Sequence, residues 1–193
     1  MMVLILGLCG CGSGSAGNTI QPWQPADEQA KAALEIVIGN GYSAFAGFDA
    51  DETYQNVKMG IEYYQDGKLK EDGNQGTFQL QDSEEGAKAV QGIAGLSVND
   101  GKAKMGVSAE GNSATVSDVE LPGFSEKKDG DLIFAASGEP RNITDGEKIY
   151  LAVLNSGSDE LGTDVLTDPG SRGKLAGKSW FFYVVFSTEP AES

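Results

Sequence analysis

Short runs in which apolar and polar residues alternate recur along most of the chain, and a period of two predicts β-strands. In residues 57–63 every second side chain is large and apolar, and those between are polar or small. Residues 103–109 follow the same pattern. The same reasoning predicts further strands over residues 42–48, 77–81, 93–98, 114–120, 132–136, 148–154 and 179–187.

The last of these runs differs from the others because it is apolar on both faces. Residues 179–187 include Trp180, three phenylalanines and one tyrosine. A strand of this kind belongs in the middle of a sheet that is covered on both sides. We therefore predict that Trp180 and its aromatic neighbours form core rather than a platform for a ligand.

Asp-Gly and Asn-Gly pairs separate many of the runs, and these pairs tolerate the positive φ angles of tight hairpins. About ten short strands at this spacing predict an all-β fold, specifically an antiparallel β-sandwich. The pairs are Asn40-Gly41, Asp66-Gly67, Asp72-Gly73, Asp100-Gly101, Asp129-Gly130 and Asp145-Gly146.

Residues 26–39 fit two interpretations. Apolar residues at 30, 33, 34 and 37 follow helical spacing, and Asp27 is placed to cap a helix. A β-branched run at 36–38, just before Gly39, instead favours a strand. We favour a helical or irregular lead-in to Ala33 followed by a strand, so the sandwich has at most one short N-terminal helix.

The composition indicates one acidic domain with a short appendage. The 193 residues include 27 glycines, 14 basic and 29 acidic residues, which gives a net charge of −15. Such a surface repels nucleic acid and anionic lipid headgroups, so we expect no nucleic-acid partner. Solubility accounts for this charge; collection of Ca²⁺ or contact with a basic partner is the alternative.

The first twelve residues point to export. Residues 1–8 form an apolar run that is too short to span a membrane and has the length of a signal-peptide core. The following Leu8-Cys9-Gly10-Cys11 resembles the lipobox of bacterial lipoproteins, with an aliphatic residue at −3, a small one at −1 and then cysteine. The resemblance implies that Cys11 receives a diacylglyceryl group, that cleavage precedes it, and that acyl chains hold the mature chain on a membrane. Cys9 does not fit, because Leu8 would stand at −1.

This resemblance organises the chain into a signal peptide over residues 1–10, a Gly/Ser/Pro-rich tether over 11–25 and a β-sandwich domain over 26–193. The expected location is the extracytoplasmic face of the cell membrane. The alternative, in which residues 1–8 form a buried first strand, is disfavoured by the Gly-Ser tract that follows them.

Familiar catalytic chemistry is scarce. The sequence has no histidine, which excludes Ser-His-Asp and Cys-His catalysis and histidine-ligated zinc. Ser171-Arg-Gly-Lys174 matches the S-x-x-K pattern of penicillin-binding enzymes, but Pro169 and Gly173 argue against the helix which that motif needs. Its two partner motifs are also missing, so we treat the match as coincidence. We predict no catalytic residue, metal site or cofactor.

The longest predicted connection is the candidate contact surface. Residues 155–178 separate the last two predicted strands, and loops longer than about 12–15 residues are commonly functional. The alternative is an unrecognised strand around residues 163–167. The charged side chains assigned to this hypothetical binding loop are Asp159, Glu160, Asp164, Asp168 and Arg172.

The leading hypothesis is therefore a non-catalytic, lipid-anchored binding module of the bacterial cell envelope. Its partners would be the membrane, through the lipidated N-terminus, and an envelope protein or a glycan. A surface carbohydrate-binding or adhesion module is the alternative, and a hydrolase that uses two carboxylates comes third. Paired exposed aromatics would favour carbohydrate, and two carboxylates ~5–10 Å apart in a cleft would favour hydrolysis. A flat surface with neither would favour a protein partner.

Overall fold

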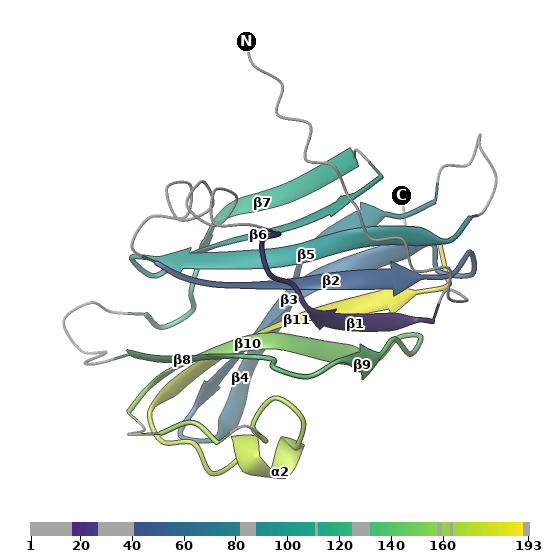
Figure 1. Ribbon diagram of the computed structural model, residues 1–193. Helices are drawn as coiled ribbons and strands as arrows, with labels where there is room; N and C mark the ends of the chain where they lie inside the picture. Colours follow the sequence, from purple (N-terminus) through teal and green to yellow (C-terminus); the bar gives the residue numbers. More distant parts are fainter. Residues whose placement is uncertain are drawn as a thin grey trace.

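Two antiparallel β-sheets pack face to face as a sandwich, which confirms the predicted fold class (Figure 1). The computed structural model describes residues 17–26, 41–81, 88–110, 112–124, 132–157, 160–162 and 164–190. Within these residues, no helix has both the length and the apolar character required to cross a membrane.

The first sheet has six strands in the order β7-β6-β5-β2-β1-β9. Strands β5, β6 and β7 follow one another in the sequence and form hairpins. By contrast, β2 pairs with β5 and β1 pairs with β9 across longer connections. Its strands are β1 (Thr19–Pro22), β2 (Tyr42–Ala50), β5 (Val90–Asn99), β6 (Lys102–Ala109), β7 (Asn112–Glu120) and β9 (Arg141–Asn142).

The second sheet has five strands in the order β4-β3-β11-β10-β8. Strand β11 lies in the middle, as its two apolar faces predicted. Its strands are β3 (Asn56–Gln65), β4 (Lys68–Gln79), β8 (Leu132–Ala136), β10 (Lys148–Ser156) and β11 (Lys178–Ser187).

Alternate side chains of both sheets meet in one core. The rings of Phe48 from β2 and Phe186 from β11 lie edge to face, with centroids 5.2 Å apart. Trp180 is fully buried, stacks on Tyr63 at a centroid distance of 5.8 Å and donates a 2.9 Å hydrogen bond from Nε1 to the Pro122 carbonyl. Its assignment to the core is therefore confirmed.

Two of the predicted Asp-Gly turns close hairpins as expected. Asp66-Gly67 and Asp100-Gly101 have positive φ at both residues and connect β3 to β4 and β5 to β6. The turn predicted at Asp72-Gly73 is wrong, because both residues lie inside β4 and pair with β3. Two register shifts in that pairing accommodate the polar, glycine-containing sequence that hid the strand between 68 and 76.

The N-terminal part of the described chain also differs from expectation. Residues 19–22, within the expected tether, form β1, with Ile20 buried in the core. Burial of this one side chain and pairing with β2 outweigh the Pro-rich composition, and Pro22 stands at the end of the strand. The lipobox, including Cys11, lies outside the described residues, as do residues 27–40, where a helix or a strand was expected.

Candidate functional site

The predicted binding loop covers the outer face of the five-stranded sheet and contains a short helix, α2 (Pro169–Arg172), visible below the sheet in Figure 1. Among the described residues from 157 to 177 in this loop, none forms a strand, so the alternative of a strand around 163–167 is wrong. We also expected Pro169 to prevent a helix at Ser171, and this expectation is wrong. Proline suits the first turn of a helix, and Asp168 caps it by accepting a 2.9 Å hydrogen bond from the Gly170 amide.

Much of this loop is packed against the sheet rather than exposed to solvent. Val165, Leu166 and Leu175 are buried against the outer-facing side chains of β10 and β11, in an apolar cluster separate from the main core. The partners of these three residues in the cluster are Tyr150, Val153, Phe181 and Tyr183. The loop therefore acts as a second layer over one sheet.

Arg172, one of the residues assigned to the contact surface, is buried beneath the loop. Its Nε donates to the Val165 carbonyl at 3.0 Å, and its Nη2 donates to the Leu166 carbonyl at 3.4 Å. The guanidinium lies over the Tyr150 ring, 3.7 Å from the centroid, and Nη1 is 3.9 Å from Glu62 Oε2. These contacts fasten the loop to the sheet, so Arg172 is not available to a partner.

The remaining assigned residues do not form one site. The Ser171 hydroxyl donates to carboxylate oxygens of both Asp164 and Asp168, which brings these two residues together at the start of α2. The hydrogen bond from the Gly170 amide, and after it the one from Ser171, hold the pKa of Asp168 below its usual value. Glu160 is exposed, and Asp159 lies outside the described residues. In the part of the chain that the structure describes, no three acidic, cysteine or histidine side chains are grouped to hold a metal ion.

A charged network lies beside the loop. Lys148 Nζ is 2.6 Å from Glu62 Oε1 and 2.6 Å from Asp72 Oδ2, and the Tyr183 hydroxyl donates to Asp72 Oδ1 at 2.8 Å. Burial opposes the charge on Lys148, but its hydrogen bonds to both carboxylates outweigh burial and raise its pKa. For Asp72, burial is likewise outweighed by the hydrogen bonds from Lys148 and Tyr183, which lower its pKa.

This network does not resemble an open pair of catalytic carboxylates. Lys148 lies between Glu62 and Asp72 and binds both, so neither acid is free to receive a substrate proton or to activate water. Tyr64 also donates a 3.1 Å hydrogen bond to Glu62. The arrangement is that of a structural ion network, in which charges buried together are paired.

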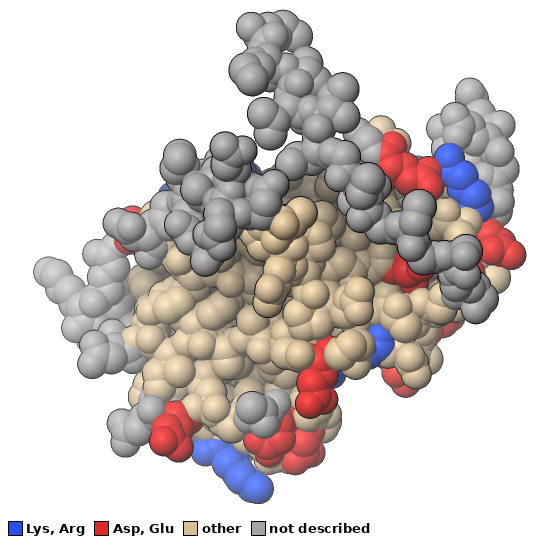
Figure 2. Space-filling model, in the orientation of Figure 1, with Lys and Arg blue, Asp and Glu red and all other residues tan. Residues whose placement is uncertain are grey.

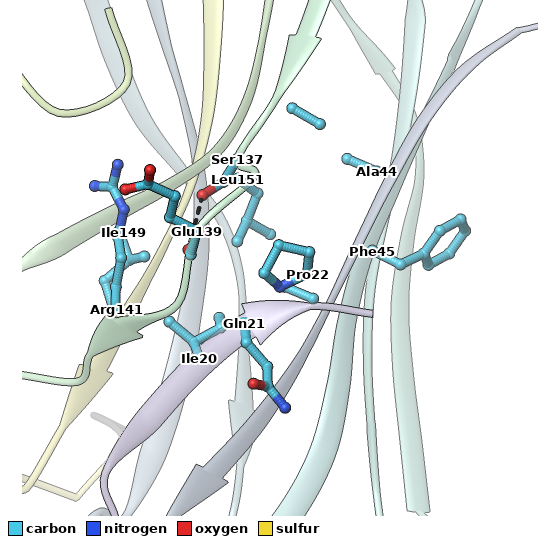
Figure 3. Close-up of a pocket in the computed structure, with 12 residues that line it drawn as sticks. Ile20, Gln21, Pro22, Ala44, Phe45, Ser137, Glu139, Arg141, Ile149 and Leu151 are labelled. Atoms are coloured by element: carbon cyan, nitrogen blue, oxygen red, sulfur yellow. Dashed lines mark hydrogen bonds between the residues drawn. The ribbon is translucent and has the colours of Figure 1, made fainter. Parts of the chain in front are cut away.

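A small pocket opens at one edge of the sandwich, between β1 and β2 on one side and β10 on the other (Figure 3). Its cavity volume of about 20 Å³ holds about one water molecule. The side chain of Phe45 points away from it, while Glu139 and Arg141 lie together on the opposite side. This pocket is too small to be a ligand site.

A larger groove runs over the outer face of the six-stranded sheet. Register places Phe45, Gly95, Gly106 and Thr115 side by side on β2, β5, β6 and β7. The Phe45 ring lies over Gly95, and Gly106 forms the floor between this ring and the Thr115 hydroxyl. The groove encloses about 330 Å³, within the range of small-molecule sites. Its ends are formed by Ile93, Ser108 and Ser113 on one side and by Ser97 and Lys104 on the other.

Trp23 completes the aromatic wall. Its backbone amide donates a 3.0 Å hydrogen bond to the Phe45 carbonyl just after β1, and its ring lies edge to face with that of Phe45 at 6.0 Å. Gly47 lies beneath Trp23, and a Cβ atom there would stand in ordinary van der Waals contact with the indole, 3.5 Å from Cδ1. Sequence analysis missed this pair, since Trp23 belonged to an expected tether and Phe45 to a strand whose exposed face was unknown.

Lys104 is the single charged side chain among the residues that line this groove. Within the described residues it has no ion-pair partner. In the view of Figure 2 the described charged side chains lie mainly at the rim of an uncharged face. The groove is therefore an apolar, locally basic feature of an acidic protein.

Comparison with known protein families gives a match for this chain. The family model described as the YgaN domain matches residues 30–164, more than half of the chain. The chain belongs to the YgaN domain family. Four of the groove residues, Phe45, Gly95, Gly106 and Thr115, lie inside the matched YgaN domain, whereas Trp23 precedes it and α2 and β11 follow it. No curated protein and no solved structure matches the chain.

Proposed function

We propose that this protein is a non-catalytic binding module, held by lipid at Cys11 on the extracytoplasmic face of a bacterial membrane. Its binding site in this proposal is the groove on the outer face of the six-stranded sheet. The single observation that carries the proposal is that groove, an open, largely apolar site of about 330 Å³ with one cationic side chain.

The anchor in this proposal rests on the lipobox-like Leu8-Cys9-Gly10-Cys11. Thr19, the start of β1, is eight residue steps from Cys11, and an extended chain spans at most about 3.5 Å per step. The start of the sandwich would thus stand within roughly 28 Å of the membrane surface. The groove, with Trp23 four residues further along, would face a ligand found at or near that surface.

The non-catalytic part of the proposal is supported by what lines the groove. Its polar side-chain groups are the hydroxyls of serines and a threonine, the Trp23 indole N–H and the Lys104 amine, with no carboxylate to act as a general acid or base. The paired carboxylates outside it are bridged by Lys148. Binding, rather than turnover, is the function that these side chains support.

A carbohydrate-binding or adhesion module is the second candidate, and the Trp23–Phe45 pair favours it. Sugar rings pack on aromatic faces, and both rings are partly exposed in the groove. However, sugar hydroxyls are usually held by side chains that can accept and donate in pairs, and no amide or carboxylate lines the groove. This scarcity favours a ligand with a larger apolar part.

Photo-cross-linking in cells tests whether the groove binds anything. A photoreactive residue replaces Ser97 at the groove in the full-length protein, and a matched variant carries it at Leu69, an exposed position on β4 of the other sheet. We expect a discrete adduct, identified by mass spectrometry, from position 97 only. Equal adducts at both positions, or none at position 97, would contradict the proposal.

A further inference from the structure

The two ends of the groove differ in polarity. At one end Ile93 and Ser108 pair across β5 and β6, and at the other end Ser97 pairs with Lys104. Between these two rows Gly95 pairs with Gly106; the Phe45 ring lies over Gly95, and Gly106 forms the floor. A ligand that runs along the strands would therefore lie on an apolar and glycine floor with its far end beside an ammonium group.

We propose that the groove binds a single-chain anionic amphiphile, with its acyl chain between the aromatic wall and β7 and its carboxylate or phosphate beside Lys104. This inference rests on the proposed function, since it names the ligand class of the same groove. Charge complementarity carries it: the chain has a net charge of −15, yet the one charge in the groove is positive.

The source of such a ligand is the membrane to which the short N-terminal segment would hold the domain. Only seven residues separate Cys11 from β1, so the groove stays within reach of lipids and of their single-chain products. An acyl chain also matches the lining better than a polar ligand does. Trp23, Phe45 and Ile93 present large apolar side chains there, and the lining surface as a whole is mostly apolar.

Tryptophan fluorescence gives a site-specific reporter. The chain has two tryptophans, and Trp180 is fully buried in the core, whereas Trp23 is partly exposed at the groove. The full-length protein with Cys11→Ser is titrated with sodium dodecanoate below its micellar concentration. We expect a saturable blue shift that is absent in the Trp23→Phe variant, with an unchanged far-ultraviolet circular dichroism spectrum.

Chain length and head group distinguish a groove from general detergent binding. Affinity should rise about twofold or more for each methylene added to a shorter fatty acid, then level off once the chain exceeds the groove. Dodecanoate should bind more tightly than dodecyltrimethylammonium or dodecyl maltoside. In a protein of net charge −15, a preference for the anion requires a local cation.

Variants test the two ends and the floor. Lys104→Gln should weaken dodecanoate binding by about threefold, the range of an exposed ion pair, and leave dodecyl maltoside binding unchanged. Lys102→Gln is the matched control, because Lys102 lies on the same strand but does not line the groove. Gly106→Val should abolish binding by filling the floor. Ser108→Phe, at an exposed position, fills the same space if Gly106→Val does not fold.

The inference fails if dodecanoate gives no saturable shift, if the cationic amphiphile binds equally well, or if Lys104→Gln and Lys102→Gln behave alike. It also fails if Trp23 responds to a polysaccharide and not to dodecanoate, which would favour the carbohydrate candidate. A specific cross-link at position 97 together with any of these results would retain the binding module and reject the amphiphile.

Discussion

The guanidinium of Arg172 lies over the ring of Tyr150, with its Cζ 3.7 Å from the ring centroid. This contact joins the predicted binding loop to β10 and turns a residue expected on the surface into part of the interior. The pKa of Tyr150 is raised, chiefly by burial and against the opposing effect of Arg172. The loop is therefore built into the fold, and its removal should have consequences for stability.

Replacing Arg172 by leucine should destabilise the protein by about 2–4 kcal/mol. The substitution leaves the Val165 carbonyl without its side-chain donor and the Leu166 carbonyl with Arg141 as its remaining guanidinium donor. It also leaves the buried Glu62 with Lys148 as its remaining cationic partner. Urea denaturation measures the loss. Lys174→Ala, an exposed change in the same loop, should stay within about 0.5 kcal/mol, and equal effects of both variants would show that the Arg172 contacts contribute nothing.

Leu166→Ala should cost about 2–4 kcal/mol, because it leaves a cavity where the loop packs on the five-stranded sheet. Replacing residues 158–176 by a short Gly-Ser turn should cost more, since Phe181 and Tyr183 would lose their cover. Thermal unfolding followed by circular dichroism checks both. A turn variant with unchanged stability would mean that the loop is dispensable to the fold and free to serve a partner.

Two glycines with nearly the same backbone angle provide a matched pair. Gly67 has φ +71° and Gly146 has φ +72°, but a Cβ atom at Gly67 would meet the Gly173 carbonyl, whereas one at Gly146 would meet nothing within 4 Å. Gly146→Ala should cost about 1 kcal/mol, from the left-handed conformation alone. Gly67→Ala should cost a further 1–3 kcal/mol or so, because the hairpin must move away from α2. Equal losses in urea denaturation would mean that the hairpin and α2 are not in contact.

Asp72 should contribute to stability only while it is ionised. Its pKa is lowered in the fold, so its contribution is present above the usual value of about 3.9 and disappears as the pH falls through the lower folded value. The difference in unfolding free energy between wild type and Asp72→Asn should therefore be constant from about pH 5 to 8 and shrink below about pH 4. A difference that persisted at pH 2 would show that the ionised carboxylate is not what matters.

The parts of the fold that could be predicted are those in which the local sequence carries a clear pattern of alternation or of turn residues. Alternation identified most strands, and positive φ at Asp66-Gly67 and Asp100-Gly101 gave the expected hairpins. Strand β1 was not predicted, because four residues with two prolines nearby are too few to show an alternation of apolar and polar side chains. Its pairing with β2 is what defines it as a strand. The polar half of β4 was hidden because an edge strand needs no apolar alternation.

The candidate site was less predictable than the fold. The Trp23–Phe45 wall depends on which strands become neighbours, since β1 joins β2 and β2 joins β5. Hydropathy gives the two faces of a strand but not the order of strands in a sheet. Arg172 failed as a surface residue for a related reason, because a charged side chain in a long loop is normally solvated unless the loop folds back over a sheet.

Metabolic labelling with an alkyne fatty acid, followed by membrane fractionation, tests directly whether the protein is a lipid-anchored module. We expect label in the wild-type protein and in Cys9→Ser, with both proteins in the membrane fraction, and neither label nor membrane association in Cys11→Ser. Label that persists in Cys11→Ser, or that is lost in Cys9→Ser instead, would contradict the anchor at Cys11.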